Sequence, residues 1–182
     1  MFLIIGYKID VVILSYVKGS EAVGWYTGAT TIIDTLAFIP AAFITAIYPI
    51  FANYFQSSPG SLVKAYESSF KYLAILSIPV AAGTTLIGDK IILYAYHSSF
   101  AQSILALQII VWSVPALFLY SLFGLMLSAT DRQHLGMRAG IAYAVINIML
   151  NMILIPYLSF IGASIVNVCT KIILFFFLYY FV

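Results

Sequence analysis

The chain has 182 residues, of which 64% are hydrophobic and 8% are charged, and its formal net charge is +2. Soluble domains carry about 25% charged residues, so this chain has too few polar side chains to cover a water-soluble globule. The small net charge and the lack of a basic patch argue against a nucleic-acid partner. The composition therefore predicts an all-α, polytopic membrane protein, with about six spans in a single membrane domain over residues 1–182.

In chain order, the expected spans are residues 1–17, 27–55, 72–87, 101–129, 135–155 and 162–182. The first is short against the roughly 20 apolar residues that a helix needs to cross a bilayer. The second is longer than required, so we expect it to tilt or to kink at Pro40 and Pro49, because a proline inside a helix removes a hydrogen bond.

Polar and helix-breaking residues separate these spans. Loops are predicted at residues 18–24, 56–61, 130–134 and 156–161. The segment 62–70 is expected to be an amphipathic lead-in that lies near the membrane interface. We expect residues 88–90 to break the chain, which leaves 91–96 as a re-entrant or interfacial turn that is too short to span.

Basic residues predict the orientation, because short cytoplasmic loops carry an excess of lysine and arginine. The connections on one side hold Lys64, Lys71, Arg132 and Arg138, whereas those on the other hold Lys18 and Lys90. The connections that hold the first group are therefore predicted to be cytoplasmic. Because six spans bring the chain back to the side on which it began, both termini are also predicted to be cytoplasmic. The expected location is the cytoplasmic membrane.

Two opposite charges lie within the first span. An ionised side chain in hydrocarbon is costly, and it is usually kept where it faces a polar interior or has a function. Asp10 is the strongest site candidate: it lines a cavity and titrates or pairs with a cation, or it makes a structural polar contact. Lys8 reaches the same cavity or extends to the interface. The two residues are about 200° apart around a helix, which disfavours a direct pair.

Four further polar residues lie inside predicted spans. Asp34 shares a cavity with Asp10 or is a hydrated residue near the outer interface. Lys171 lies in the middle of the last span, one turn after Asn167, where it would face a cavity and balance an aspartate. Asn147 and Asn151 are on one helix face, where they line a cavity or bridge neighbouring helices.

Catalytic and cofactor motifs are not found. His97 and His134 fall in predicted loops, and no zinc-protease, phosphate-binding-loop or nucleophile-elbow motif occurs. The single cysteine, Cys169, lies in an apolar run, where we expect it to pack. We therefore expect no enzyme activity, no cofactor and no metal site, which disfavours the alternative of a membrane-embedded glycosyl- or acyltransferase.

Several segments in order carry a family resemblance. The stretch 10–26, DVVILSYVKGSEAVGWY, is followed by FIP at 38–40, IYP at 47–49, LMLSATDRQ at 125–133 and IGAS at 161–164. Together they resemble the C-terminal half of polysaccharide export flippases, the O-antigen and teichoic-acid transporters of the multidrug/oligosaccharidyl-lipid/polysaccharide superfamily. The resemblance implies a two-lobe protein with about twelve to fourteen spans. This chain would be the C-terminal lobe, with its first helix truncated and an N-terminal lobe missing.

The resemblance also implies a function. Such a transporter moves lipid-linked oligosaccharide or polysaccharide repeat units by alternating access, so the partners would be the lipid-linked glycan, membrane lipids, the other lobe and a coupling H⁺ or Na⁺. The resemblance implies that Lys171 would bind the phosphate of the substrate and that Asn147 and Asn151 would bind its sugar hydroxyls. It also implies that the carboxylates would hold the coupling ion. A cation-coupled multidrug antiporter of the same superfamily remains an alternative, because two lysines balance two aspartates in the spans. A further alternative is a non-transporting scaffold that assembles with a separate N-terminal lobe.

Overall fold

All the regular structure in the described residues is helical, in agreement with the predicted all-α class. The computed structural model describes residues 2–181, with side chains from Lys8 onward, so the predicted cytoplasmic termini, Met1 and Val182, lie outside the described residues. The elements are α1 (Phe2–Leu36), α2 (Phe38–Ser57), α3 (Pro59–Tyr96), a 3₁₀ turn (Ser98–Phe100), α4 (Ser103–Ile110), a second 3₁₀ turn (Val111–Ser113), α5 (Val114–Ala129) and α6 (Gln133–Phe181).

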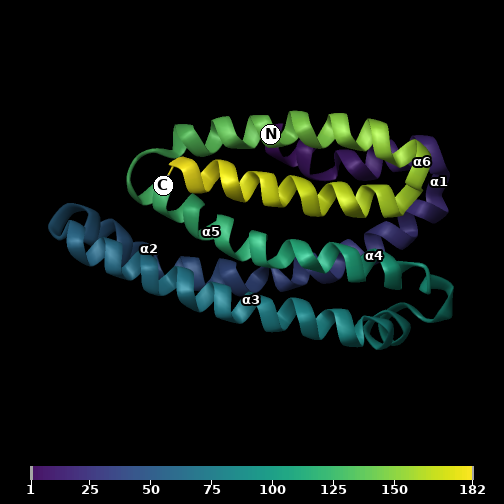
Figure 1. The fold of residues 1–182 in the computed structure, drawn as a ribbon, viewed down its shortest axis with the longest axis horizontal. Coiled ribbons are helices and arrows are strands. Elements are labelled where there is room, and N and C mark those ends of the chain that lie inside the picture. The colour runs from purple at the N-terminus through teal and green to yellow at the C-terminus, as the bar shows by residue number, and fades with distance from the viewer. Residues whose placement is uncertain (1, 182) are drawn as a thin grey trace.

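The first and last helices each double back at one residue. Gly19 (φ 83°) interrupts α1, and Ser159 (φ 54°) interrupts α6. The Tyr26 hydroxyl donates a hydrogen bond to Asp10, 16 residues earlier. A straight helix would separate two such residues by about 24 Å, so the bond requires a reversal between them. Figure 1 shows the same feature in α6, whose second half (yellow) returns along the first.

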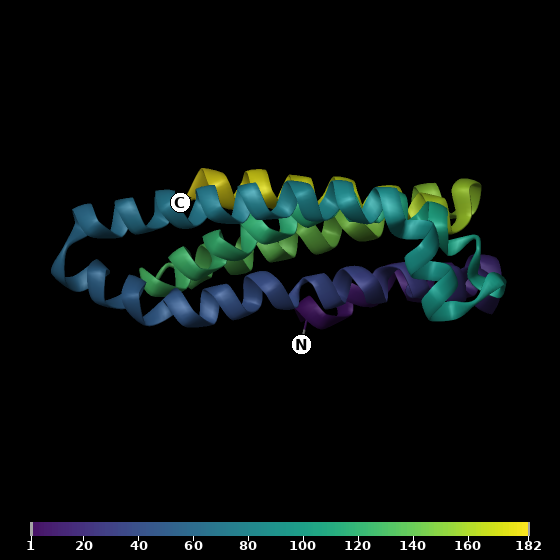
Figure 2. The same cartoon turned by 90° about the horizontal axis from the view of Figure 1, so that it is seen from below.

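Four helical stretches are long and apolar enough to cross a membrane: Lys8–Ser57, Pro59–Tyr96, Gln102–Ala129 and Gln133–Phe181. The first and last contain the two bends, so the chain passes back and forth along the bundle as the six predicted spans require (Figures 1 and 2). The α2–α3 and α5–α6 connections lie at one end, and the two bends and the α3–α4 connection lie at the other. The connections therefore divide between the two ends of the bundle in the same way as in the prediction of orientation from basic residues.

The predicted break at residues 88–90 is wrong, and so is the separate turn at 91–96. Both belong to one continuous helix of 38 residues, which also contains the lead-in 62–70 and the span 72–87. A glycine inside a helix costs about 1 kcal/mol relative to alanine, but Gly88 is buried where α4 approaches. A Cβ at that position would lie 3.5 Å from the Leu107 side chain, and Ile92 of the next turn is fully buried. Packing against α4 therefore keeps the segment helical.

The helix of the second predicted span is interrupted once, and two predicted loops are shorter than expected. The chain leaves α1 at Leu36 and enters α2 at Phe38, four and two residues before Pro40, which has no N–H to donate to the carbonyl of Leu36. Pro49 lies inside α2 without ending it. The predicted loops 18–24 and 156–161 are sharp bends at Gly19 and Ser159 with helix on both sides.

The α4–α5 segment forms the centre of the bundle. Its fully buried residues include Ala106, Leu107, Ile110, Val111, Val114 and Phe118. Helices α1 and α6 pack around this apolar segment. Their polar residues are consequently brought to one side of it, which positions the site described next.

Candidate functional site

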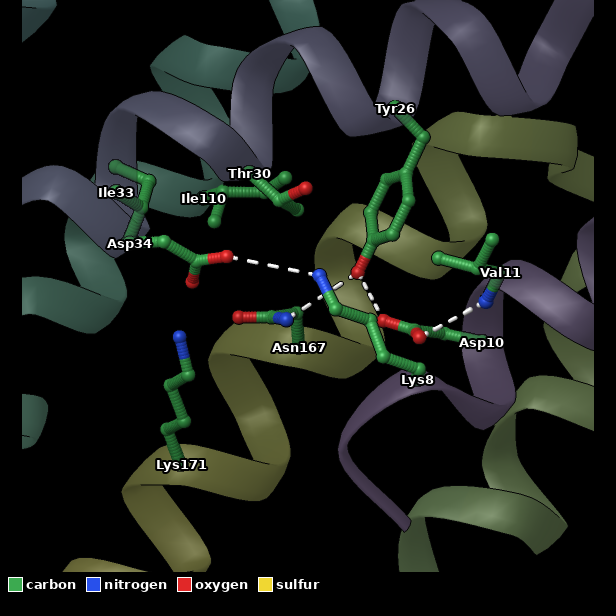
Figure 3. Close-up of a pocket in the computed structure, with 10 residues that line it drawn as sticks. All are labelled: Lys8, Asp10, Val11, Tyr26, Thr30, Ile33, Asp34, Ile110, Asn167 and Lys171. Atoms are coloured by element: carbon green, nitrogen blue, oxygen red, sulfur yellow. Dashed lines mark hydrogen bonds and ion pairs between the residues drawn. The ribbon is translucent and has the colours of Figure 1, made fainter. Parts of the chain in front are cut away.

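A small polar pocket lies between the two halves of α1, the end of α4 and the second half of α6. Its volume is ≈ 10 Å³, close to the minimum that holds a single water molecule. Figure 3 shows the side chains that line it. The polar ones among them are Lys8, Asp10, Tyr26, Thr30, Asp34, Asn167 and Lys171.

Asp10 lies at the end of a chain of hydrogen bonds. Its carboxylate is 5% exposed and accepts bonds from the Tyr26 hydroxyl and from the backbone N–H of Val11, the latter at 2.8 Å. The Tyr26 oxygen in turn accepts a bond of 3.2 Å from the amide of Asn167. These contacts join both halves of α1 to α6 and supply the partners that a buried carboxylate needs.

A second pair of charges closes the other side of the pocket. The Lys8 ammonium lies 3.6 Å from the Asp34 carboxylate, and the two side chains are 53% and 38% exposed. The bend at Gly19 makes this ion pair possible, because Lys8 and Asp34 come from opposite halves of α1. The pair lies at the open edge of the pocket, whereas Asp10 is covered.

Lys171 is buried beside both aspartates. Its side chain is 3% exposed, and its ammonium donates a hydrogen bond of 3.2 Å to the hydroxyl of Ser113 in the turn between α4 and α5. Asp34 and Asp10 both act electrostatically on this ammonium. Figure 3 shows Asn167 between Lys171 and the Tyr26 hydroxyl. Among the described residues, the carbonyl oxygen of Asn167 is buried without a hydrogen-bond partner.

The structure brings four of the six predicted site residues together: Lys8, Asp10, Asp34 and Lys171. It places the other two elsewhere, since Asn147 and Asn151 are buried within the hairpin of α6. Asn147 donates a bond of 3.2 Å to Thr170 across that hairpin, and Asn151 bonds back to Asn147. This geometry corresponds to the helix-bridging alternative.

Sequence reasoning missed Tyr26 and Ser113 as members of the cluster. Tyr26 follows the predicted loop at residues 18–24, a position that is typical of an aromatic residue at the membrane interface. The structure instead buries it fully. Its link to Asp10 depends on the bend at Gly19, and no helical spacing signals a contact over 16 residues. A serine such as Ser113 carries no signal of its own, because most serines in membrane helices bond their own backbone.

The arrangement is suited to binding charged or hydroxyl groups. It offers ammonium, carboxylate and amide groups at the edge of a buried pocket. In the described part of the chain, no three His, Cys, Asp or Glu residues are grouped as a metal site would require.

Comparison with known proteins gives one match. The sequence model of the MatE family matches residues 1–153. No curated protein and no solved structure matches the chain. The matched range contains Lys8, Asp10 and Asp34, whereas Asn167 and Lys171 lie beyond it.

Proposed function

Since the chain belongs to the MatE family, whose members are multi-pass membrane transporters, we propose that it forms one lobe of a flippase for lipid-linked oligosaccharide or polysaccharide repeat units. The proposed lobe is the C-terminal one, in the cytoplasmic membrane, with both termini in the cytoplasm. An N-terminal lobe completes the pathway, and the two lobes alternate in access around a central site.

The observation that carries this proposal is the environment of Lys171. Its ammonium is buried and bonded to a neutral hydroxyl. The two neighbouring carboxylates already have close partners of their own, Tyr26 for Asp10 and Lys8 for Asp34. A phosphate oxygen would give Lys171 a charged partner, and lysine binds phosphate as a point charge.

The dimensions of the pocket support a second lobe. A volume of ≈ 10 Å³ is too small for a sugar or a phosphate, so the phosphate would reach Lys171 only when the pocket opens toward the second lobe as access alternates. The sugar would lie against the edge where Lys8 and Asp34 are partly exposed. A charged pair at that edge is costly next to lipid, and it is better solvated by a polar cavity shared with another lobe. The proposed coupling ion, H⁺ or Na⁺, would exchange with Lys8 at Asp34.

The alternative is a cation-coupled multidrug antiporter of the same superfamily. Two carboxylates in one pocket favour it, because a cationic drug needs anionic partners. The two functions differ in which charged residue they require. A phosphate-bearing substrate depends on Lys171, whereas a cationic drug depends on Asp10 or Asp34 and is repelled by Lys171.

Inverted membrane vesicles from cells that produce the protein provide the test, because they retain any lobe with which the chain assembles. A fluorescent polyprenyl-diphosphate oligosaccharide is added, and its transfer is followed by protection from an impermeant quencher. We expect Lys171→Met to slow transfer at least about tenfold, as the loss of a charge-assisted bond implies. Lys90→Met is the control, because Lys90 is exposed in α3 away from the pocket.

Efflux of a cationic dye is measured in the same vesicles. Normal glycan transfer by the Lys171→Met protein at normal expression would refute the role of Lys171. Dye efflux that is unchanged or faster in this variant, without glycan transfer by the wild type, would establish the antiporter instead.

A further inference from the structure

A second hollow shares no lining residue with the polar pocket. It lies where the last helix ends, at the end of the bundle marked C in Figure 1. This groove has a volume of ≈ 680 Å³ and lies between the beginning of α3, the end of α5 and the end of α6. Its walls include Tyr66, Glu67, Met126, Phe176, Tyr179 and Tyr180. None of these residues belongs to the proposed transport site.

The charge pattern of α3 indicates that the groove lies at the depth of the lipid headgroups. In α3, residues 72–88 carry no charge and are bounded by Lys71 and Asp89. This stretch is about 26 Å long, close to the roughly 30 Å thickness of the hydrocarbon core. Glu67 lies one turn beyond Lys71, about 6 Å further out. A carboxylate at this level meets polar headgroups while the apolar walls continue inward.

The groove combines one carboxylate with several aromatic rings. Glu67 is exposed and, in the described part of the chain, forms no ion pair. Tyr66 and Tyr179 are held in place by Phe123, with ring centroids 6.3 and 6.0 Å from it. Aromatic faces attract ammonium groups, most strongly where a carboxylate adds its charge. The geometry is that of a preformed site for an organic cation.

Two lysines extend this pattern to a zwitterion. Lys64 and Lys71 are three residues before and four residues after Glu67, so all three share one face of α3. Such neighbours are about 5–6 Å apart, a separation that a phosphoethanolamine group bridges. We propose that this groove binds a zwitterionic phospholipid, with its ammonium at Glu67 and the tyrosine rings and its phosphate at Lys64 or Lys71.

The charges disfavour other occupants. A lipid with a phosphate and no ammonium places a second anion beside Glu67 and leaves only Lys64 and Lys71 to balance both. A second copy of the chain or an apolar helix would remove Glu67 and these two lysines from water, which is unfavourable. An ammonium-bearing headgroup satisfies both charges, while one acyl chain lies on Met126 and Phe176.

The test is the retention of lipid by the purified 182-residue chain in native mass spectrometry. Phosphatidylethanolamine and phosphatidylglycerol with identical acyl chains are offered at equal mole fraction. We expect phosphatidylethanolamine to be retained about fivefold better, and Glu67→Gln to abolish this preference. Glu21→Gln is the matched control, because Glu21 is an exposed carboxylate in α1 outside the groove.

A second variant examines the aromatic wall. Tyr180→Leu should lower phosphatidylethanolamine retention about twofold to fivefold. Tyr180 is 85% exposed, so its replacement leaves the packed core intact. Equal retention of the two lipids by the wild type, or an unchanged preference in Glu67→Gln, would overturn the proposal. So would a dimer whose formation depends on Glu67 and excludes lipid.

Discussion

Replacing Tyr26 by phenylalanine removes a single oxygen atom that joins three segments of the chain. That oxygen donates to Asp10 in the first half of α1 and accepts from Asn167 in α6. Tyr26 and Asp10 are 0% and 5% exposed, so water does not readily replace the lost bonds. The ring itself remains, and the apolar packing is therefore unchanged.

The expected loss of stability follows from the two bonds. Hydrogen bonds between membrane helices contribute about 0.6 kcal/mol on average, a value that suits the neutral bond from Asn167. A bond to a charged group is worth about 1.5–3 kcal/mol, which applies to the Asp10 carboxylate. We expect Tyr26→Phe to lower the free energy of unfolding by about 2–3.5 kcal/mol.

Reversible unfolding in mixed detergent micelles measures this change. Helix content is followed by circular dichroism, and local opening is followed by the fluorescence of Trp25, whose ring lies 5.4 Å from that of Phe160. Tyr16→Phe is the control, because Tyr16 is in the same helix but 89% exposed. We expect it to change stability by no more than about 0.5 kcal/mol.

The reasoning is refuted if Tyr26→Phe costs no more than the control. A double-mutant cycle with Asp10→Leu separates the direct bond from other effects. In the Asp10→Leu protein, the further change at Tyr26 should cost about 1 kcal/mol or less, because only the bond from Asn167 remains to be lost. An equal cost in both backgrounds would show that Tyr26 acts on stability without Asp10.

Two further substitutions test the hairpin of α6. Gly162→Ala should destabilise the protein by about 1–3 kcal/mol, because a Cβ would lie 2.7 Å from a backbone carbonyl oxygen. Gly83→Ala is the control. Nothing lies within 4 Å of a Cβ at that position, so this change should be neutral or stabilising. Equal unfolding midpoints for these two variants would contradict the steric argument. Asn147→Leu should cost about 0.6–1.7 kcal/mol, because it removes the bond to Thr170 and the bond that the Asn147 side chain accepts from Asn151 but keeps the buried volume. No change in the same unfolding assay would show that these two bonds do not stabilise the hairpin.

Local sequence was sufficient to predict the spans where a charge or a proline–glycine turn ends an apolar stretch. The turn at 56–61 and the polar loop at 130–134 both occur close to the predicted positions. The prediction failed in α3, because Gly88 and the charges at Asp89 and Lys90 predict a break locally. Burial of Gly88 and Ile92 within the bundle outweighed that preference.

The candidate site was predictable residue by residue but not as an assembly. The cost of a charge in hydrocarbon identifies Asp10, Asp34 and Lys171 from the sequence alone. This cost does not indicate which charged side chains lie next to each other. Asn147 is also a polar residue inside a predicted span, although it lies within the α6 hairpin and away from the pocket. The pairing of Lys8 with Asp34 depends on a bend in α1 whose direction the sequence does not specify.

The sequence by itself determined that this protein is helical, crosses a membrane and carries a few costly polar groups, because composition and apolar run length fix how a segment partitions into a bilayer. Only the tertiary structure decided that Asp10 is bonded to Tyr26, that Asp34 is paired with Lys8 and that Lys171 is bonded to a neutral hydroxyl. The physical reason is that the cost of burying a charge is a property of one residue and can be inferred from the sequence. The hydrogen bonds and ion pairs that offset this cost depend on other residues. Those residues are brought close by the bends at Gly19 and Ser159 and by packing around α4 and α5.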